Sequence, residues 1–333
     1  MMSSACLEHI RLIRESKSYT DSLYAVLTAA HIFNGPKYML SGLSGMAFKF
    51  TVHEKLLPMS VTAYGQWGDE HWQAVNNLGV YTEWDGGRTR HPTFRYYQQD
   101  AVQAVKDSLD RGIGVIYWLP EFGVIYGYDD EDEVFYVQDG SSREGQIVLY
   151  HNFGLNSTPF WYCQVFGEHV HVARETMILE SLRLAILDWE TPYKTLPHTD
   201  IASGRMAYAF LRQGLEKGGF DEDGAVYILD NYLCARTEIR DYLQAVSGTW
   251  PELGQAFNLY DHLVCTVSGI KGCIKETAGL RRVDRRQVHE LIAMLTAAES
   301  LEEQAISLFR AIAGKYPDLK RSTVPRWGTH SPR

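Results

Sequence analysis

A series of strand-like segments in the middle of this 333-residue chain constrains its fold more than any other feature. The segments are rich in Val, Ile, Tyr and Phe, and turn sequences separate them; they cover residues 114–119, 121–129, 133–140, 145–150 and 160–172. Parallel neighbours need a crossover of a dozen or more residues, and these connections are shorter. We therefore expect an antiparallel sheet.

Helical patterns come before the strands. Residues 19–33 place apolar side chains on one face, and Thr20 or Asp21 is expected to cap the start of that helix. Residues 97–112 form a second amphipathic pattern that ends at a glycine. Between them, "MAFKFTVH" (46–53) alternates like a half-buried strand.

The pattern changes at residue 173 and stays helical almost to the end of the chain. We expect helices near residues 173–189, 201–217, 223–246, 252–268 and 284–313. The predicted organisation is an α+β domain over 1–172, an all-helical domain over 173–315 and a flexible basic tail over 316–333.

Composition excludes several classes of function. A net charge of −9 argues against a partner that is nucleic acid, because such binding needs a basic surface. No apolar run is long enough to span a membrane, and the N-terminus has no apolar core of a secretory signal. Five cysteines without a C-x-x-C pattern are typical of reduced thiols, so we expect a cytoplasmic protein.

No cofactor or metal is expected. The chain has no G-x-G-x-x-G and no Walker sequence. The acidic run at 129–133 lacks the spacing of a calcium loop and is typical of a solvated hairpin turn. Nothing in the sequence indicates an oligomeric state.

The stretch "WLPEFGVIYGYDDEDEVFYVQDG" (118–140) carries a resemblance. Its Gly127-Tyr128-Asp129 turn and its terminal Asp139, placed after an early helix, resemble the papain-like cysteine peptidase fold. The more similar branch contains the bacteriocin-leader-processing peptidases and the N-terminal domain of the butirosin-biosynthesis acyltransferase. This resemblance implies a central N-terminal helix packed against a twisted antiparallel sheet, followed by a helical region.

The resemblance also locates a candidate centre in which both catalytic residue types are substituted. Glu121 stands where the family has His, and Ser22, or alternatively Asp21, stands where a Cys opens the helix. The implied catalytic set is Ser22, Asp21, Glu121 and Asp139, with Trp118, Tyr128 and Asp129 at the substrate site. Serine forms no accessible anion, and Glu lacks the poise of His near neutral pH. Glu121 and Asp139 could instead bind a cation or satisfy free helix N–H groups.

Two functional hypotheses follow from the resemblance. In the first, the chain is a butirosin-acyltransferase-like enzyme of specialised metabolism, an acyltransferase or amide hydrolase acting on an amine- or peptide-like small molecule. Its partners would be that substrate and an acyl carrier protein. In the second, it is a catalytically inactive relative, a pseudoenzyme that binds a small molecule or a protein partner.

A charged face is predicted in the helical half. Tyr232, Arg236 and Arg240 recur every four residues, and Asp230 can pair with a nearby arginine. We expect a charged stripe at a surface or domain boundary. The alternative is a role in holding an acidic ligand or a carrier protein.

Overall fold

The computed structural model describes residues 4–142, 145–194 and 199–317. Its contacts divide the chain into two compact units. Unit 1 contains residues 1–40 and 75–172, and unit 2 contains residues 41–74 and 173–333. The boundary at residue 173 coincides with the predicted change of character. Residues 41–74, however, pack with the helical half. Residues 318–333, most of the predicted basic tail, lie outside the described residues.

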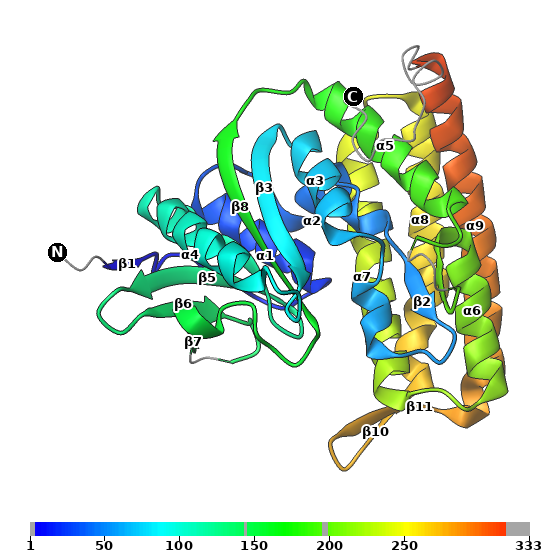
Figure 1. Ribbon diagram of the computed structural model, residues 1–333. Helices are drawn as coiled ribbons and strands as arrows, with labels where there is room; N and C mark the ends of the chain where they lie inside the picture. The colour runs from blue at the N-terminus through cyan, green and yellow to red at the C-terminus, as the bar shows by residue number, and fades with distance from the viewer. Residues whose placement is uncertain (1–3, 143–144, 195–198, 318–333) are drawn as a thin grey trace. The chain divides into compact units, whose positions relative to one another are not determined.

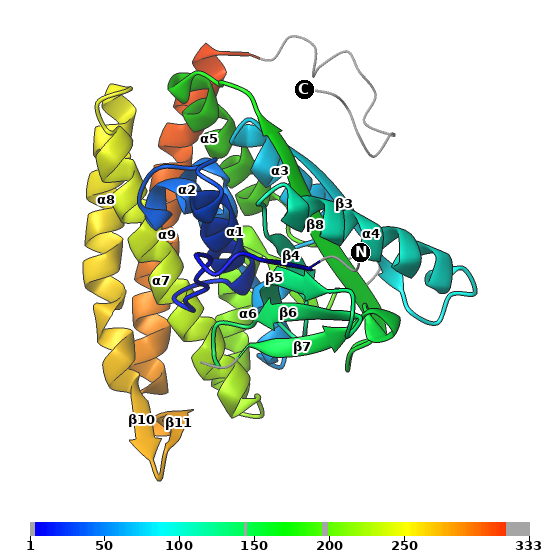
Figure 2. The same cartoon turned by 90° about the vertical axis from the view of Figure 1, so that its left-hand side faces the viewer.

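Unit 1 is built on an antiparallel sheet, as the short connections predicted. Its main path has the strand order β3–β8–β4–β5–β6–β7, which can be followed in Figures 1 and 2. The strands are β3 (Val80–Arg88), β4 (Val115–Trp118), β5 (Phe122–Asp129), β6 (Val134–Gln138), β7 (Gln146–Leu149) and β8 (Phe160–His169). A short strand, β1 (Ser4–Cys6), pairs with the last three residues of β5.

Two helices cover opposite faces of this sheet (Figure 1). Helix α4 (Phe94–Asp110) packs Val105 and Leu109 into a core that includes Tyr117 and Phe135. Helix α1 (Ser18–Ala29) places Tyr19 edge-on against Phe122, with ring centroids 5.5 Å apart. Because successive side chains of a strand point to opposite faces, alternate strand residues face α1 and α4.

Helix α1 begins earlier than its sequence pattern predicted. Its first residue is Ser18, and Lys17 occupies the N-cap position without a side-chain cap. Thr20 and Asp21 therefore lie inside the helix, and the prediction that either caps it was wrong. Asp21 does not cap the helix because its carboxylate accepts hydrogen bonds from the N–H groups of Glu15 and Ser16, in the preceding loop, instead of those of its own helix.

Unit 2 is mainly helical, which confirms the coarse prediction of a helical half after a sheet-containing half. Its helices are α5 (Arg174–Glu190), α6 (Gly204–Lys217), α7 (Glu222–Val246), α8 (Pro251–Val267) and α9 (Val288–Lys315). Helix α8 lies beside both α7 and α9, and Figure 2 shows the three side by side. A hairpin of β10 (Ile274–Thr277) and β11 (Leu280–Val283) precedes α9, where no strand was expected.

Residues 41–74 join unit 2 through a small strand pair. The expected strand over 46–53 is shorter, because Met46–Phe48 form a 3-10 turn and only β2 (Thr51–His53) is extended. This strand pairs with β9 (Ile201–Ser203), which leads into α6. The chain passes between the units within helices α2 (Lys37–Leu43) and α3 (Trp67–Asn77), and a third time after residue 172.

Candidate functional site

The start of helix α1 holds a hydroxyl against a carboxylate. Ser18, the first residue of the helix, donates a side-chain hydrogen bond to Glu121, which directly precedes β5. The turn that presents Glu121 is closed by a 3.0 Å hydrogen bond from the N–H of Leu119 to the Glu121 carbonyl. Ser18 is only 2% exposed. The structure thus brings Glu121 to the helix terminus, where its partner is Ser18.

An arginine from the N-terminal segment lies at the same point. Arg14 donates from one guanidinium nitrogen to the carbonyl of Ser18, at 3.2 Å, and from another to the carbonyl of Phe122. Gln138 holds the segment in place, because it accepts from the N–H of Leu12 and donates to the carbonyl of Ile10, both at 2.9 Å. The guanidinium therefore joins the start of α1 to the start of β5.

Ser22 and Asp21, the residues predicted at the helix opening, have structural partners. The Ser22 hydroxyl is buried and donates to the carbonyl of Phe122 at 3.1 Å. The Asp21 carboxylate accepts the N–H groups of Glu15 and Ser16 and pairs with Lys37 at 2.5 Å. Both side chains fix the loop and strand around α1, one turn away from the Ser18–Glu121 contact.

Asp139 is held in its own turn. It accepts N–H bonds from Ser141 and Ser142 at 2.8 and 2.9 Å and a side-chain bond from Gln146 at 2.6 Å. Partial burial raises the pKa of Asp139, but these hydrogen bonds outweigh burial and hold the pKa below its usual value. A carboxylate in this state accepts hydrogen bonds and is a poor general acid near neutral pH.

The residues predicted to contact substrate also have protein partners. Trp118 donates to Thr158 at 3.0 Å and stacks on Phe160. Tyr128 is 1% exposed, and its hydroxyl donates to Asp110 at 2.8 Å. Asp129 accepts the N–H of Glu131 at 2.8 Å within the acidic turn. Among the residues that the structure describes, no group of three His, Cys, Asp or Glu side chains is arranged to hold a metal.

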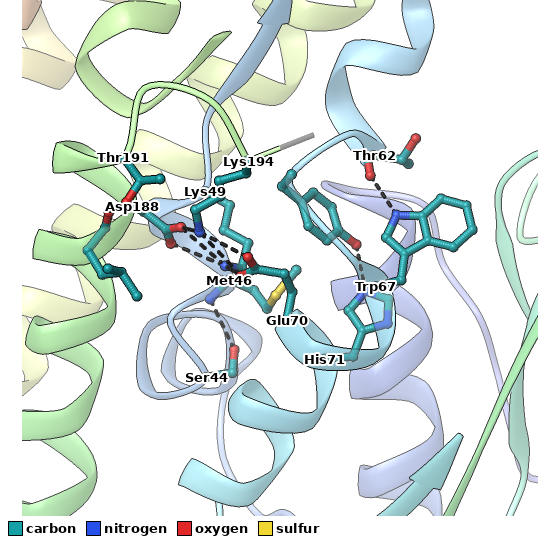
Figure 3. Close-up of polar contacts among 12 residues, drawn as sticks. Ser44, Met46, Lys49, Thr62, Trp67, Glu70, His71, Asp188, Thr191 and Lys194 are labelled. Atoms are coloured by element: carbon teal, nitrogen blue, oxygen red, sulfur yellow. Dashed lines mark hydrogen bonds and ion pairs between the residues drawn. The ribbon is translucent and has the colours of Figure 1, made fainter. Parts of the chain in front are cut away.

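Unit 2 contains a buried cluster of four charges that the sequence did not reveal (Figure 3). Lys49 and Lys194 both pair with Asp188 and with Glu70. The nitrogen–oxygen distances are 3.2 Å for Lys49–Asp188 and 3.1 Å for Lys194–Glu70. The only signal was a lysine between two phenylalanines in "FKF", since a charge in an apolar alternation needs a buried partner.

This charge cluster is balanced, which favours a structural role. Burial lowers the pKa of Lys49, but Asp188 and Glu70 outweigh it and raise the pKa above its ordinary value. Burial likewise raises the pKa of Asp188, and the two lysines lower it further than burial raises it. A lysine held as a cation is not a nucleophile, because nucleophilic attack needs the neutral amine. The cluster ties residues 41–74 to α5 and the segment after it.

A histidine and a tyrosine lie beside this cluster. The Tyr64 hydroxyl and the Nε2 atom of His71 are 2.7 Å apart, and His71 is fully buried. Burial, and then the charge of Lys49, lower the pKa of His71 well below its ordinary value. The imidazole is therefore neutral at physiological pH and lies within hydrogen-bond distance of the Tyr64 hydroxyl.

The charged face predicted on α7 is partly internal. Arg236 is 1% exposed and pairs with Glu302 of α9 at 2.8 Å, and its guanidinium lies 4.5 Å from the centre of the Tyr232 ring. Only Arg240 remains near the surface, paired with Asp241 at 2.7 Å. The prediction of a stripe at a surface or domain boundary was wrong for Tyr232 and Arg236, which are buried inside unit 2, where Glu302 supplies a carboxylate and aromatic rings pack on the guanidinium.

Comparison with known proteins gives no family for this chain. Among the described residues, no helix combines the length and the apolar character needed to cross a membrane. No protein-family model matches the sequence, and a search of curated proteins gives no significant match.

Proposed function

We propose that unit 1 has a papain-like fold and that the chain is a non-catalytic relative of the butirosin-type acyltransferases, which binds a small molecule or a protein partner. The main support for this proposal is the hydrogen bond from Ser18 to Glu121 at the start of α1. In that fold a thiol opens the helix and an imidazole opens the facing strand. In this proposal the Ser18 hydroxyl, and not Ser22 or Asp21 as expected from the sequence, takes the thiol position, and the Glu121 carboxylate takes the imidazole position.

The arrangement of unit 1 supports the papain-like part of the proposal. An early helix, α1, packs against β4 and β5 of an antiparallel sheet, and its first residue meets the residue that precedes β5. Asp139 follows β6, the next strand along the chain. The resemblance depends on this order: an early helix, then a strand that begins with the catalytic base, then an aspartate after the next strand.

The chemistry of the pair supports the non-catalytic part. A serine hydroxyl becomes a nucleophile when a base with a pKa near the working pH removes its proton, and a carboxylate is a much weaker base than imidazole. Ser18 is buried, and Arg14 donates to its carbonyl from beside the helix start. These contacts stabilise a closed helix terminus and leave the hydroxyl little room to reach an acyl group.

A titration tests the geometric part of this proposal. The double substitution Ser18→Cys/Glu121→His restores a thiol and an imidazole at the two positions, and Ser18→Cys alone is the matched control. Thiolate absorbance near 240 nm should appear about two pH units lower in the double variant, because an adjacent imidazolium and a helix N-terminus both stabilise the anion. The papain-like assignment would be refuted if thiolate absorbance rose at the same pH in both variants.

A turnover assay tests the functional part. A simple acyl thioester serves as donor and spermidine as acceptor, with hydrolysis and transfer followed together. We expect the wild-type protein to be no faster than Ser18→Ala.

A second candidate function is an acyltransferase that uses Ser18 as nucleophile and Glu121 as base. The same hydrogen bond favours it, since free N–H groups at a helix start can stabilise an oxyanion. The turnover assay separates the two. Activity that Ser18→Ala abolishes and Ser22→Ala keeps would establish the enzyme and overturn the non-catalytic proposal.

A further inference from the structure

A groove in unit 1 lies away from the start of α1. It is formed by β3, β8 and α4 and has a volume of about 780 Å³. Small-molecule sites commonly measure about 300–1,000 Å³, so this groove has the size of a binding site for a small organic molecule. We refer to it as the β3–β8–α4 groove.

The groove has an apolar floor with one exposed aromatic ring. Its accessible apolar surface comes from half-buried Val165, from Val170, which is 62% exposed, and from Tyr81, which is 59% exposed. The Tyr81 ring lies over Gly167, where an added Cβ would come within 2.8 Å of a ring carbon. The glycine therefore lets the ring lie flat against β8, which provides a fixed surface for an apolar or cationic group.

Three carboxylates line the same groove without a cation of their own. Glu83 accepts from the Tyr81 hydroxyl, and Asp107 accepts from Gln103 at 2.7 Å. Glu168, the third, lies at the end of β8. Within the described part of the chain none of the three forms an ion pair. Arg111 also lines the groove, and its guanidinium donates to the carbonyl of Phe166 at 3.1 Å.

The acidic character extends along the groove. Asp85 follows Glu83 on the same face of β3, and Asp100 precedes Asp107 by two helical turns on α4. Burial, and then the charge of Asp100, raise the pKa of Asp85. The field in this region therefore favours a positive charge.

A second cavity shows that this charge imbalance is not general. The cavity lies in unit 2, measures about 520 Å³ and also has three carboxylates in its wall. There each carboxylate has an arginine: Glu190 and Glu303 pair with Arg310 at 2.8 Å, and Glu299 pairs with Arg212 at 2.6 Å. Among the described residues, one set of cavity carboxylates is paired with arginines and the other set forms no ion pair.

We propose that the β3–β8–α4 groove binds a small organic amine, with its apolar part on Val170 and the Tyr81 ring and its ammonium group between Glu83, Asp107 and Glu168. Charge complementarity and the apolar floor together select this class over a bare metal ion or a neutral molecule. The inference deepens the proposed function, because it rests on a binding role for unit 1 and names the ligand class.

Phenethylamine and its neutral isostere 2-phenylethanol are the probes, titrated by NMR into the full-length protein at low and high salt. We expect the amine to bind about tenfold more tightly at about 50 mM salt, because two or three partly exposed ion pairs supply a difference of that order. The difference should shrink at about 500 mM salt, where screening is strong. Equal binding of the two probes, or no binding of either, would overturn the proposal.

Two triple variants locate the site. Glu83→Gln/Asp107→Asn/Glu168→Gln removes the groove carboxylates, and Glu131→Gln/Asp132→Asn/Glu133→Gln removes as many charges from the exposed hairpin turn of the same unit. The first should abolish the preference for the amine, and the second should keep it. Equal loss in both variants would mean that the amine responds only to net charge, which refutes a site.

The single variant Tyr81→Ala separates the two parts of the groove. It should weaken the amine and the alcohol alike while keeping their ratio, since it removes apolar surface and no charge. Unchanged affinity for both probes would exclude the aromatic contact. Turnover that depends on Ser18 would overturn the proposed function without altering these binding results, so the two failures are distinguishable.

Discussion

The hydroxyl of Ser18 and the carboxylate of Glu121 are joined by a hydrogen bond across 103 positions of sequence. This contact ties the first residue of α1 to the residue that precedes β5, so it couples a helix that packs on the sheet to one of its inner strands. Arg14 reinforces the junction from a third segment through the carbonyls of Ser18 and Phe122.

A double-mutant cycle measures this contact. Ser18→Ala and Glu121→Ala should each lower the free energy of unfolding by about 1–3 kcal/mol, because each removes one partner of a hydrogen bond to a half-buried carboxylate. The double variant should lose less than the sum of the two, with a coupling of about 0.5–3 kcal/mol. Urea denaturation supplies the free energies. Strict additivity would show that the two side chains do not interact.

The buried pair of Arg236 and Glu302 should be far more sensitive to truncation than an exposed pair. Glu302→Ala leaves the guanidinium without its carboxylate in a site where Arg236 is 1% exposed, and it should cost about 3–5 kcal/mol. Asp230→Ala removes the partner of Arg281 on the surface and should cost less than about 1 kcal/mol. Urea denaturation of the two variants compares them. Similar losses would mean that Arg236 is hydrated in solution.

The sequence predicted local structure better than it predicted partners. Short connections determined the antiparallel sheet, since a hairpin turn allows no other pairing. The start of α1 was misplaced because "SYTDS" offers several capping residues, and the choice of Ser18 depends on Glu121, far away in the chain. Lys49 could not be matched with Asp188, because a lone buried lysine reveals the need for a carboxylate and not its identity. Fold class follows from the hydrophobic periodicity of local segments, whereas sites are formed by pairs of residues that are far apart in the sequence.

Two glycines in helices should respond in opposite ways to the same added methyl group. At Gly42 a Cβ would lie 2.2 Å from the buried Tyr242 ring, so Gly42→Ala should destabilise the protein by about 1–3 kcal/mol through overpacking. At Gly254 in α8 the space is open, and Gly254→Ala should stabilise by about 0.4–1 kcal/mol because the unfolded chain loses freedom. Melting temperatures of the two variants should move in opposite directions. A shift in the same direction would contradict the packing at Gly42.

His71 should make the protein less stable in mild acid. Burial holds its folded pKa well below the unfolded value of about 6.5, so below pH 6.5 the unfolded chain binds a proton that the folded chain refuses. Stability from this residue is complete above pH 6.5 and falls as the pH decreases toward the folded pKa. His71→Gln, which cannot be protonated, should remove this part of the pH dependence in urea denaturation. Burial beside Lys49 and Tyr64 should make protonation of the imidazole costly in the folded protein. If the free energy of unfolding varied with pH in the same way for wild type and His71→Gln, this cost would be absent.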